Sequence, residues 1–189
     1  FIEKSILKEN VGNQDQIFAA YGGLNLIRLT KKNKLVKKIK LKNNSFRNLE
    51  SNLMIFYTNI QRNSNNIEKD KILKLDKKIE HYHNIKKITS DAYKYLLNGD
   101  INSFGDLLHM YWLEKKRLSP LVSNKNLDDI YSVAMNSGAR GGKILGAGSG
   151  GFFMFYCEKK FQKKLINNLK KLHLLNFKFT NDFSICKEI

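Results

Sequence analysis

A glycine-rich stretch from Gly138 to Cys157 constrains the fold of this chain more than any other feature. It holds seven of the 12 glycines in the 189-residue sequence. The cluster Gly146–Gly151 separates Lys143-Ile144-Leu145 from the apolar run Phe152–Cys157. A short apolar run with aromatic residues beside a glycine cluster is typical of a buried strand. The stretch therefore predicts a strand, a glycine loop and a second strand.

The glycine loop has two interpretations. Glycine adopts positive φ and admits a close neighbour, and successive backbone N–H groups in such a loop can form an anion site. A hairpin turn without a ligand explains the same residues, and the glycines alone favour it. No Gly-Lys-Ser/Thr closes the loop, which excludes a P-loop pattern, and a strand rather than a helix follows it, which excludes a Rossmann fingerprint.

Composition limits the remaining classes. The net charge of +17 comes from 34 Lys and Arg against 17 Asp and Glu, which is compatible with a nucleic-acid partner or an anionic substrate. The lysines are spread along the chain and form no compact basic arm, so nucleic-acid binding is the weaker hypothesis. Cys157 is expected to be a buried free thiol. Neither the two cysteines nor the four histidines form a metal pattern. The sequence has no signal-peptide pattern and no apolar stretch of membrane length, so we expect a cytoplasmic protein.

The order of the expected elements indicates an α+β fold. Strands are expected at 24–29, 35–41 and 53–58, and residues 64–118 are expected to be helical with a stop at Asn98-Gly99. Pro120 ends that run, and Ser123 or Asn126 begins the next helix. A further helix covers 161–172, residues 1–9 are the tail of a helix, and residues 176–189 are expected to form two short strands around Asn181-Asp182.

Several of these residues together resemble the GHMP sugar and small-molecule kinases. The segment Gly138-Ala139 followed by Gly142-Lys143-Ile144-Leu145 and the Gly146–Gly151 loop resembles the C-terminal glycine motif of that family, and within it the D-glycero-D-manno-heptose 7-phosphate kinases match best. The resemblance implies a ferredoxin-like C-terminal domain at 51–189 and the end of the N-terminal domain at 1–50. It places Gly146, Ala147, Gly148, Ser149, Gly150 and Gly151 near the transferred phosphate. Ser149 stands where glycine is more usual, and a serine with positive φ is strained.

A second motif surrounds Asp15. The residues alone allow a helix cap or a first-turn carboxylate for Asp15. Gly12-x-Gln-Asp-Gln followed by Tyr21-Gly22-Gly23 resembles the segment that carries the catalytic aspartate in many GHMP kinases. The resemblance implies that Asp15 orients the acceptor hydroxyl and takes its proton, and that Tyr21 and Gly22 contact the substrate.

Two weaker matches supply candidates for anion binding. The strand at 53–58 leads into Asn59-Ile60-Gln61-Arg62, where the heptose kinases have Thr-Gly-x-x-Arg. Asn59 tolerates positive φ, so the turn is expected to survive. Arg62 then binds a substrate phosphate or is a solvated arginine; Arg28 and Lys143 are further candidates. The phrase from Phe104 to Ser119 also matches. Of its Lys115 and Lys116, at least one is expected to be solvated at the helix end, and the alternative is that one reaches the substrate phosphate.

The resemblance implies transfer of the ATP γ-phosphoryl group, with Mg²⁺, to the anomeric hydroxyl of a phosphorylated heptose. The Pro-x-x-x-Gly-Leu-Gly-Ser-Ser loop that binds ATP in the family does not occur in this sequence. The magnesium ligands are largely expected outside this chain. The chain begins with Phe1, which suggests a piece of something longer, and we expect it to be inactive alone. The alternatives are a fragment that binds a separate N-terminal half, a homo-oligomer, or another GHMP kinase such as a galactokinase.

Overall fold

A computed structural model describes residues 6, 12, 14–30, 32–60, 64–73 and 76–185, with only the backbone at 64–66, 72 and 73. The elements in chain order are α1 (Gln14–Tyr21), β1 (Asn25–Leu29), β2 (Lys34–Lys38), α2 (Asn43–Asn52), β3 (Leu53–Tyr57), α3 (Ser64–Leu73), the 3-10 turn η2 (Asp76–Lys78), α4 (Ile79–Asn98), α5 (Ile101–Leu118), η3 (Pro120–Val122), α6 (Lys125–Asn136), β4 (Ala139–Ile144), β5 (Phe152–Cys157), α7 (Lys159–Asn168) and β6 (His173–Leu175).

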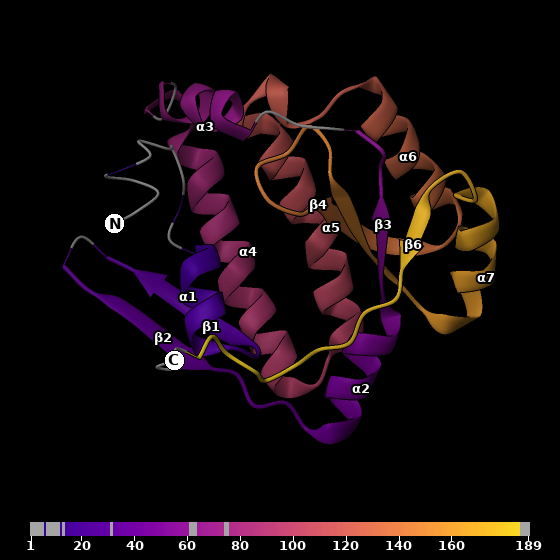
Figure 1. The fold of residues 1–189 in the computed structure, drawn as a ribbon, viewed down its shortest axis with the longest axis horizontal. Helices are drawn as coiled ribbons and strands as arrows, with labels where there is room; N and C mark the ends of the chain where they lie inside the picture. The colour runs from indigo at the N-terminus through magenta and orange to yellow at the C-terminus, as the bar shows by residue number, and fades with distance from the viewer. Residues whose placement is uncertain are drawn as a thin grey trace.

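The main sheet has the strand order β4-β5-β3-β6, and every neighbouring pair is antiparallel. β3 is followed by the helices α3 to α6, and β4 and β5 then form a hairpin. After α7, β6 pairs with the free edge of β3 (Figure 1). This is the strand order of a ferredoxin-like sheet. The predicted α+β class and the predicted glycine hairpin are confirmed.

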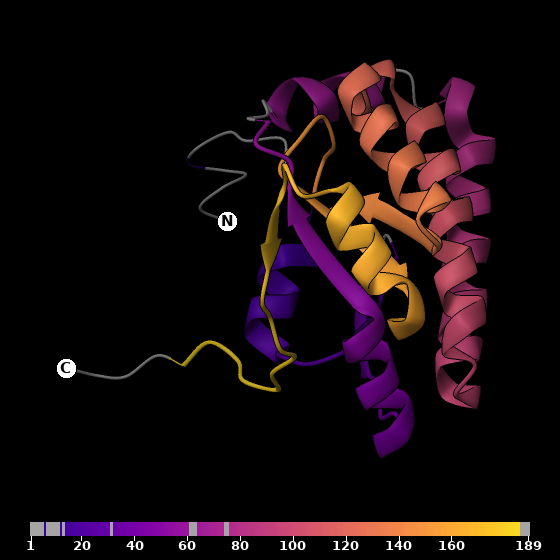
Figure 2. The ribbon, with the colours of Figure 1, turned by 90° about the vertical axis from the view of Figure 1, so that its right-hand side faces the viewer.

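The two long helices α4 and α5 lie side by side and form a layer beside the sheet (Figure 2). α4 ends where expected: Gly99 adopts φ 78° and its N–H donates to Leu96 O, which is a left-handed helix cap. α5 begins with Asp100, whose side chain accepts from Ser103 N–H at 3.1 Å. The predicted helical stretch is therefore confirmed, with breaks at η2 and at Gly99.

A cluster of aromatic residues fills the space between this helical layer and the sheet. Phe153 and Phe155 of β5 stack with 4.8 Å between ring centroids, and Trp112 of α5 meets Phe153 edge-on at 5.5 Å. Tyr131 of α6 contacts the same rings, and its hydroxyl lies 2.7 Å from His109 Nδ1. Burial raises the pKa of Tyr131 above its usual value, so the phenol stays neutral. Trp112 is at the centre of this cluster, because its side chain is fully buried.

The first part of the described chain packs into a second cluster. β1 and β2 pair as an antiparallel hairpin in the register Asn25↔Lys38 to Leu29↔Lys34, as predicted. Ile39 and Leu49 are buried with Leu53, Leu96 and Tyr156. The expected boundary at residue 50 falls inside α2, and this cluster contains residues from both sides of it.

Three expectations differ from the structure. The two strands expected in the tail are wrong for 176–185, which contain no strand; Phe177 and Phe179 pack against the second cluster, and the Phe179 N–H donates to the Glu50 carboxylate at 2.7 Å instead of to a strand. The helix expected to begin at Ser123 or Asn126 is α6, which begins at Lys125. Its cap is Asn124, whose side chain accepts from Leu127 N–H. The helix α2 was not predicted. The helix expected at 1–9 lies outside the described residues, apart from Ile6.

Candidate active site

The glycine loop between β4 and β5 consists almost entirely of residues with positive φ. Gly146, Gly148, Gly150 and Gly151 have φ values of 77°, 131°, 155° and 86°. Ser149 has φ 64°, a region in which a side chain costs energy. The strain expected at Ser149 is thus present in the structure. Asn59 has φ 57°, so the turn expected there also forms.

Two neighbouring segments approach the loop so closely that side chains have no room. A Cβ on Gly148 would lie 2.8 Å from Val122 O, and one on Gly150 would lie 2.5 Å from Ile60 O. The Ser149 N–H donates to Val122 O at 2.7 Å, and the Gly151 N–H donates to Ile60 O at 3.0 Å. The glycines are therefore needed both for conformation and for contact with η3 and with the segment after β3.

The carbonyl groups of the loop are bound by two lysines and a threonine. Lys115 Nζ of α5 donates to Ile144 O at 3.1 Å and to Gly146 O at 2.5 Å. Lys71 Nζ of α3 donates to Ala147 O at 3.1 Å and pairs with Glu68 at 2.8 Å. Thr58 Oγ1 donates to Gly151 O at 2.8 Å. The loop thus has a fixed conformation.

Of the Lys115-Lys116 pair, Lys115 is not solvated, and Lys116 keeps a side chain that is 31% exposed. Lys115 is only 4% exposed, because it reaches inward to the loop carbonyls. Lys116 is partly buried, and its Nζ lies 3.0 Å from the Asp128 carboxylate. Helical spacing alone places these residues near the end of α5 but does not reveal the carbonyls that they meet.

Lys143, a candidate for anion binding, lies on β4 and contacts α5. Its Nζ lies 4.5 Å from the centroid of the Tyr111 ring, a cation–π distance. Both residues are partly buried. The ring therefore restrains the position of the Lys143 ammonium group.

The second motif forms α1 and the turn after it. Asp15 is exposed in the first turn of α1, and Tyr21 at the end of the helix is exposed as well. Gly22 has φ 57°, and a Cβ there would lie 2.1 Å from Asp182 O. The tail also binds α1, since Ser184 N–H donates to Ala19 O at 2.8 Å.

The structure brings some of these candidates together and separates others. The six loop residues and Lys143 share the β4–β5 hairpin, and Asp15, Tyr21 and Gly22 share α1 and its turn. Figures 1 and 2 both place α1 below the glycine loop. Arg28 is exposed and pairs with Leu35 near the tip of the β1–β2 hairpin, which Figure 1 shows well apart from the loop. Arg62 lies outside the described residues.

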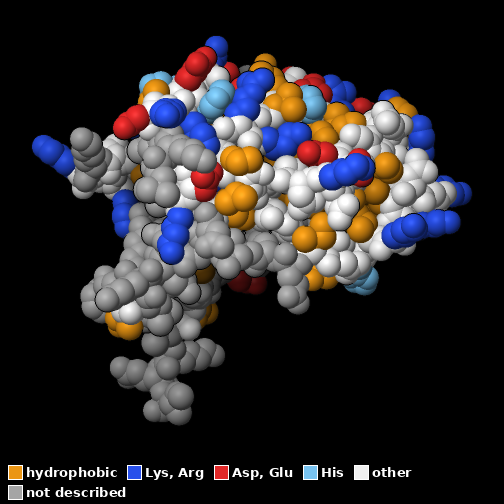
Figure 3. Space-filling model, turned by 90° about the horizontal axis from the view of Figure 1, so that it is seen from above, with side chains coloured by type: hydrophobic (Ala, Val, Ile, Leu, Met, Phe, Trp, Pro, Cys, Tyr) orange, Lys and Arg blue, Asp and Glu red, His pale blue; other side chains and the backbone are white. Residues whose placement is uncertain are grey.

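The end of the molecule that carries α3 faces the viewer in Figure 3. Lys and Arg side chains gather in the middle of this face, and apolar and acidic side chains lie beside them. Lys71, Lys78 and Lys116 belong to the elements at this end. Lys78 donates to Leu118 O, the last residue of α5, so part of this positive charge is bound to backbone carbonyls.

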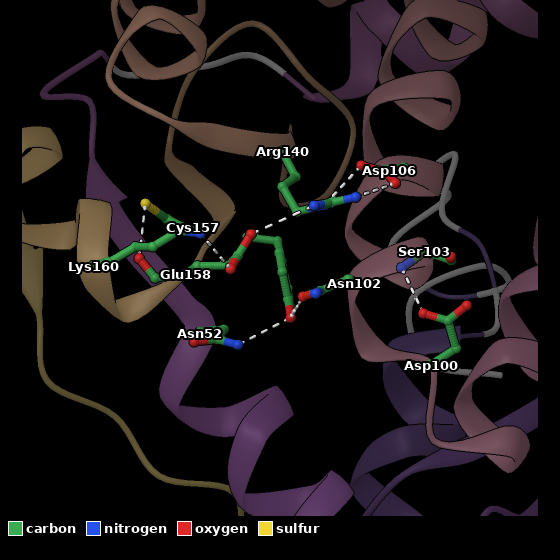
Figure 4. A network of polar contacts seen from close by, with 10 residues as sticks. Asn52, Asp100, Asn102, Ser103, Asp106, Arg140, Cys157, Glu158 and Lys160 are labelled. Carbon is green, nitrogen blue, oxygen red and sulfur yellow. Dashed lines mark hydrogen bonds and ion pairs between the residues drawn. The ribbon is translucent and has the colours of Figure 1, made fainter.

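A separate polar network joins the start of β4 to the start of α5 (Figure 4). Arg140 donates to both carboxylate oxygens of Asp106, at 2.9 and 2.6 Å, and lies 3.4 Å from Glu158; these bonds raise the pKa of Arg140. The Tyr156 hydroxyl donates to Asn102 and accepts from Asn52, both at 2.9 Å. Burial raises the pKa of Cys157 to about 11, so this free thiol is neutral, as expected. The network is structural, because its groups bind one another.

The described residues supply no metal site: among them no group of three His, Cys, Asp or Glu side chains could hold an ion. Within the same part of the chain, no helix combines the length and apolar character needed to cross a membrane.

The fold and the loop define a class. Residues 92–173 match the family model described as GHMP kinases C terminal, a range that runs from α4 through the glycine hairpin to β6. This part of the chain is a GHMP kinase C-terminal domain, as the glycine motif indicated.

Individual relatives are more specific. The chain is 34% identical, over 99% of its length, to a D-glycero-alpha-D-manno-heptose 7-phosphate kinase of Campylobacter jejuni, and it covers 55% of that protein. The crystal structure of a putative sugar kinase from Campylobacter jejuni superposes with a TM-score of 0.72 at 31% identity, over 96% of this chain and 53% of that one. A D-glycero-D-manno-heptose 1-phosphate kinase from Bacteroides thetaiotaomicron gives a TM-score of 0.72 at 27% identity, over 96% and 50%. The chain thus spans about half the length of these relatives.

Sequence reasoning missed two residues at this site. Lys71 lies in a helix whose charges follow no apolar stripe, and nothing in the sequence links it to Ala147 O. Thr58 was expected only as the end of a strand, although it binds Gly151 O with both its N–H and its hydroxyl. Both bonds join segments more than 70 residues apart, and such pairs leave no local sequence signal.

Proposed function

We propose that this chain is the C-terminal portion of an ATP-dependent sugar kinase that phosphorylates a heptose 7-phosphate at its anomeric hydroxyl. The glycine loop is the observation that carries the proposal. It has positive φ at five positions and fixed carbonyl partners, and its residues match the family motif. The similarity to the heptose phosphate kinases supports the choice of sugar.

In this proposal Asp15 is the catalytic carboxylate. It orients the acceptor hydroxyl and accepts its proton as the oxygen attacks the γ-phosphorus, and the bond from that phosphorus to ADP breaks. The exposed position of Asp15 in α1 leaves the carboxylate accessible to a substrate. The loop, Tyr21 and Gly22 line the substrate, with Arg28, Arg62 and Lys143 as weaker candidates for anion contact.

The test is an ADP-release assay with ATP, Mg²⁺ and heptose 7-phosphate. The 189-residue chain is expected to show little or no activity, because the family's nucleotide loop is absent from it. Supplied with the part of the kinase that its relatives contain in addition, it is expected to release ADP. Asp15→Asn should then lower kcat by roughly 10²–10⁴-fold, and Asp91→Asn, an exposed carboxylate paired with Lys94, should not.

Equal activity of Asp15→Asn and wild type would remove Asp15 from the mechanism. Activity with galactose or another small alcohol, and none with the heptose phosphate, would replace the substrate and keep the kinase. Asp15-dependent phosphorylation by the chain alone would contradict the expected inactivity.

Association with a separate N-terminal half is the second candidate. Leu29 and Leu35 are 50% and 57% exposed on the β1–β2 hairpin, and a two-stranded hairpin is marginally stable by itself. Such an apolar surface favours a partner. Co-expression with that half followed by mass measurement tests it, and a chain that remains alone contradicts it.

A further inference from the structure

Two lysines bind carbonyl groups on one side of the glycine loop. Lys115 Nζ binds Ile144 O and Gly146 O, and Lys71 Nζ binds Ala147 O. The two lysines are 4% and 7% exposed and come from different helices, α5 and α3. Buried ammonium groups that bind backbone carbonyls fix the peptide planes to which those carbonyls belong.

Peptide planarity then determines where the opposite N–H groups lie. In a trans peptide the C=O and the N–H point in opposite directions. The Ile144–Leu145 peptide shows this arrangement. Its Ile144 O accepts from Lys115, and its Leu145 N–H donates in the opposite direction, across the hairpin, to Phe152 O at 2.8 Å. The Gly146–Ala147 and Ala147–Gly148 peptides, whose carbonyls accept from Lys115 and Lys71, therefore direct the N–H groups of Ala147 and Gly148 away from these lysines.

These two N–H groups are consecutive, and neither donates to another residue in the described part of the chain. By contrast, Ser149 N–H and Gly151 N–H are occupied by Val122 O and Ile60 O. Two adjacent N–H groups on a glycine-rich backbone, with the Lys115 ammonium group and the Lys71–Glu68 ion pair behind them, suit a phosphate oxygen.

We propose that Lys115 and Lys71 are positioning residues: each holds one peptide plane of the loop so that the Ala147 and Gly148 N–H groups meet a phosphate of the substrate or nucleotide. This inference rests on the proposed kinase function for the identity of the anion. Lys115 controls the Gly146–Ala147 peptide, and Lys71 controls the Ala147–Gly148 peptide. Neither lysine contacts the phosphate itself.

The experiment measures backbone amide exchange and ¹⁵N chemical shifts in the 189-residue chain, with inorganic pyrophosphate as the probe. Lys115→Met and Lys71→Met are each expected to speed exchange at the hydrogen-bonded Ser149 and Gly151 amides of the loop by about tenfold. Lys115→Met should also change the ¹⁵N shift of Ala147, and Lys71→Met that of Gly148. Lys164→Met is the matched control, because Lys164 Nζ also binds a backbone carbonyl, Asn136 O at 3.0 Å, in an exposed place away from the loop. Amides of β3 and β5 should keep their exchange rates in all three variants.

Pyrophosphate is expected to shift the Ala147 and Gly148 amides in the wild type and in Lys164→Met, and to shift them less in the two loop variants. Separate titrations with ATP and with heptose 7-phosphate then tell which substrate supplies the phosphate. Should Lys115→Met fail to fold, Lys71→Met still tests the second peptide.

Two failures are distinguishable. Unchanged loop exchange in both lysine variants would overturn the positioning role. Faster exchange in the variants, together with no response of the wild-type loop to any phosphate, would uphold the positioning of the loop and overturn the proposed phosphate contact.

Discussion

Gly141 shows how one missing side chain sets the distance between a helix and a strand. A Cβ at this position would lie 2.4 Å from Gly105 O and 2.5 Å from His109 N–H nitrogen, both backbone atoms of α5. Backbone atoms within a helix cannot rotate away as a side chain can. The close packing of α5 on β4 therefore depends on this residue, and so does the reach of Lys115 to the loop.

Gly141→Ala is expected to lower the free energy of unfolding by about 1–3 kcal/mol, the usual cost of overpacking. Urea denaturation at neutral pH measures it. Gly12→Ala is the control, because a Cβ there would meet only Gln14 N, at an ordinary contact distance of 4.0 Å. If Gly141→Ala unfolds at the same urea concentration as the wild type, α5 can move away from β4 without a loss of stability.

For single residues, the sequence predicted backbone conformation better than it predicted the partners of side chains. The positive φ of Ser149 and Asn59 follows from motif position and residue type, and both occur. The partners of Lys115 and Lys143 could not be predicted, because a lysine near a helix end or in a strand has many reachable neighbours. The roles of Asp15, Tyr21, Gly22, Arg28 and Arg62 remain proposals.

Among the elements, α6 depends on a cap that the sequence placed imprecisely. Asn124 takes the extended conformation, and its side chain accepts from Leu127 N–H at 3.1 Å. Ser123, the other nearby polar residue, donates to Asp128 instead. Several cap-forming residues stand within four positions here, so the sequence could not choose between them.

Asn124→Ala should destabilise the protein by about 1 kcal/mol, because one N–H at the helix start loses its acceptor. Asn124→Asp should keep most of the stability, since a carboxylate also caps. Thermal unfolding of the three proteins compares them. Equal losses in both variants would show that the contribution of Asn124 is not the cap.

The spacing of apolar residues predicted the strands and the long helices, because each of these elements buries one face and its apolar residues therefore recur at the period of a strand or a helix. The helix α2 was missed because its only buried residue is Leu49. The tail was mistaken for strands because Phe177 and Phe179 alternate with polar residues, although they pack on the second cluster without a ladder.

The whole molecule is held together by its tail as well as by its sheet. Phe179 packs on Phe46 of α2, with 5.5 Å between ring centroids, and on Phe177 at 5.8 Å. Its backbone N–H binds Glu50. The tail also binds α1 through the bond from Ser184 N–H to Ala19 O, so residues near both ends of the described chain are in direct contact.

Phe179→Ala is expected to cost about 1–3 kcal/mol, less than the full loss for a completely buried phenylalanine, because Phe179 is only partly buried. Hydrogen exchange should rise most in β1, β2 and α2. Phe183→Ala, at an exposed side chain, serves as the control and should change little. Uniformly faster exchange across β3 and β5 as well would contradict a local role for the tail.

Trp112, the single tryptophan of the sequence, is buried in the aromatic cluster between sheet and helices and absent from the second cluster. The fluorescence of Trp112 therefore reports on the unfolding of the aromatic cluster and not on that of the second cluster. A denaturation curve followed by emission and one followed by a probe near Phe46 coincide if both halves melt as a single cooperative unit. Different midpoints for the two curves would instead show that the two clusters unfold independently. Because Trp112 is the natural probe of the aromatic cluster, the sheet needs no engineered label for this comparison.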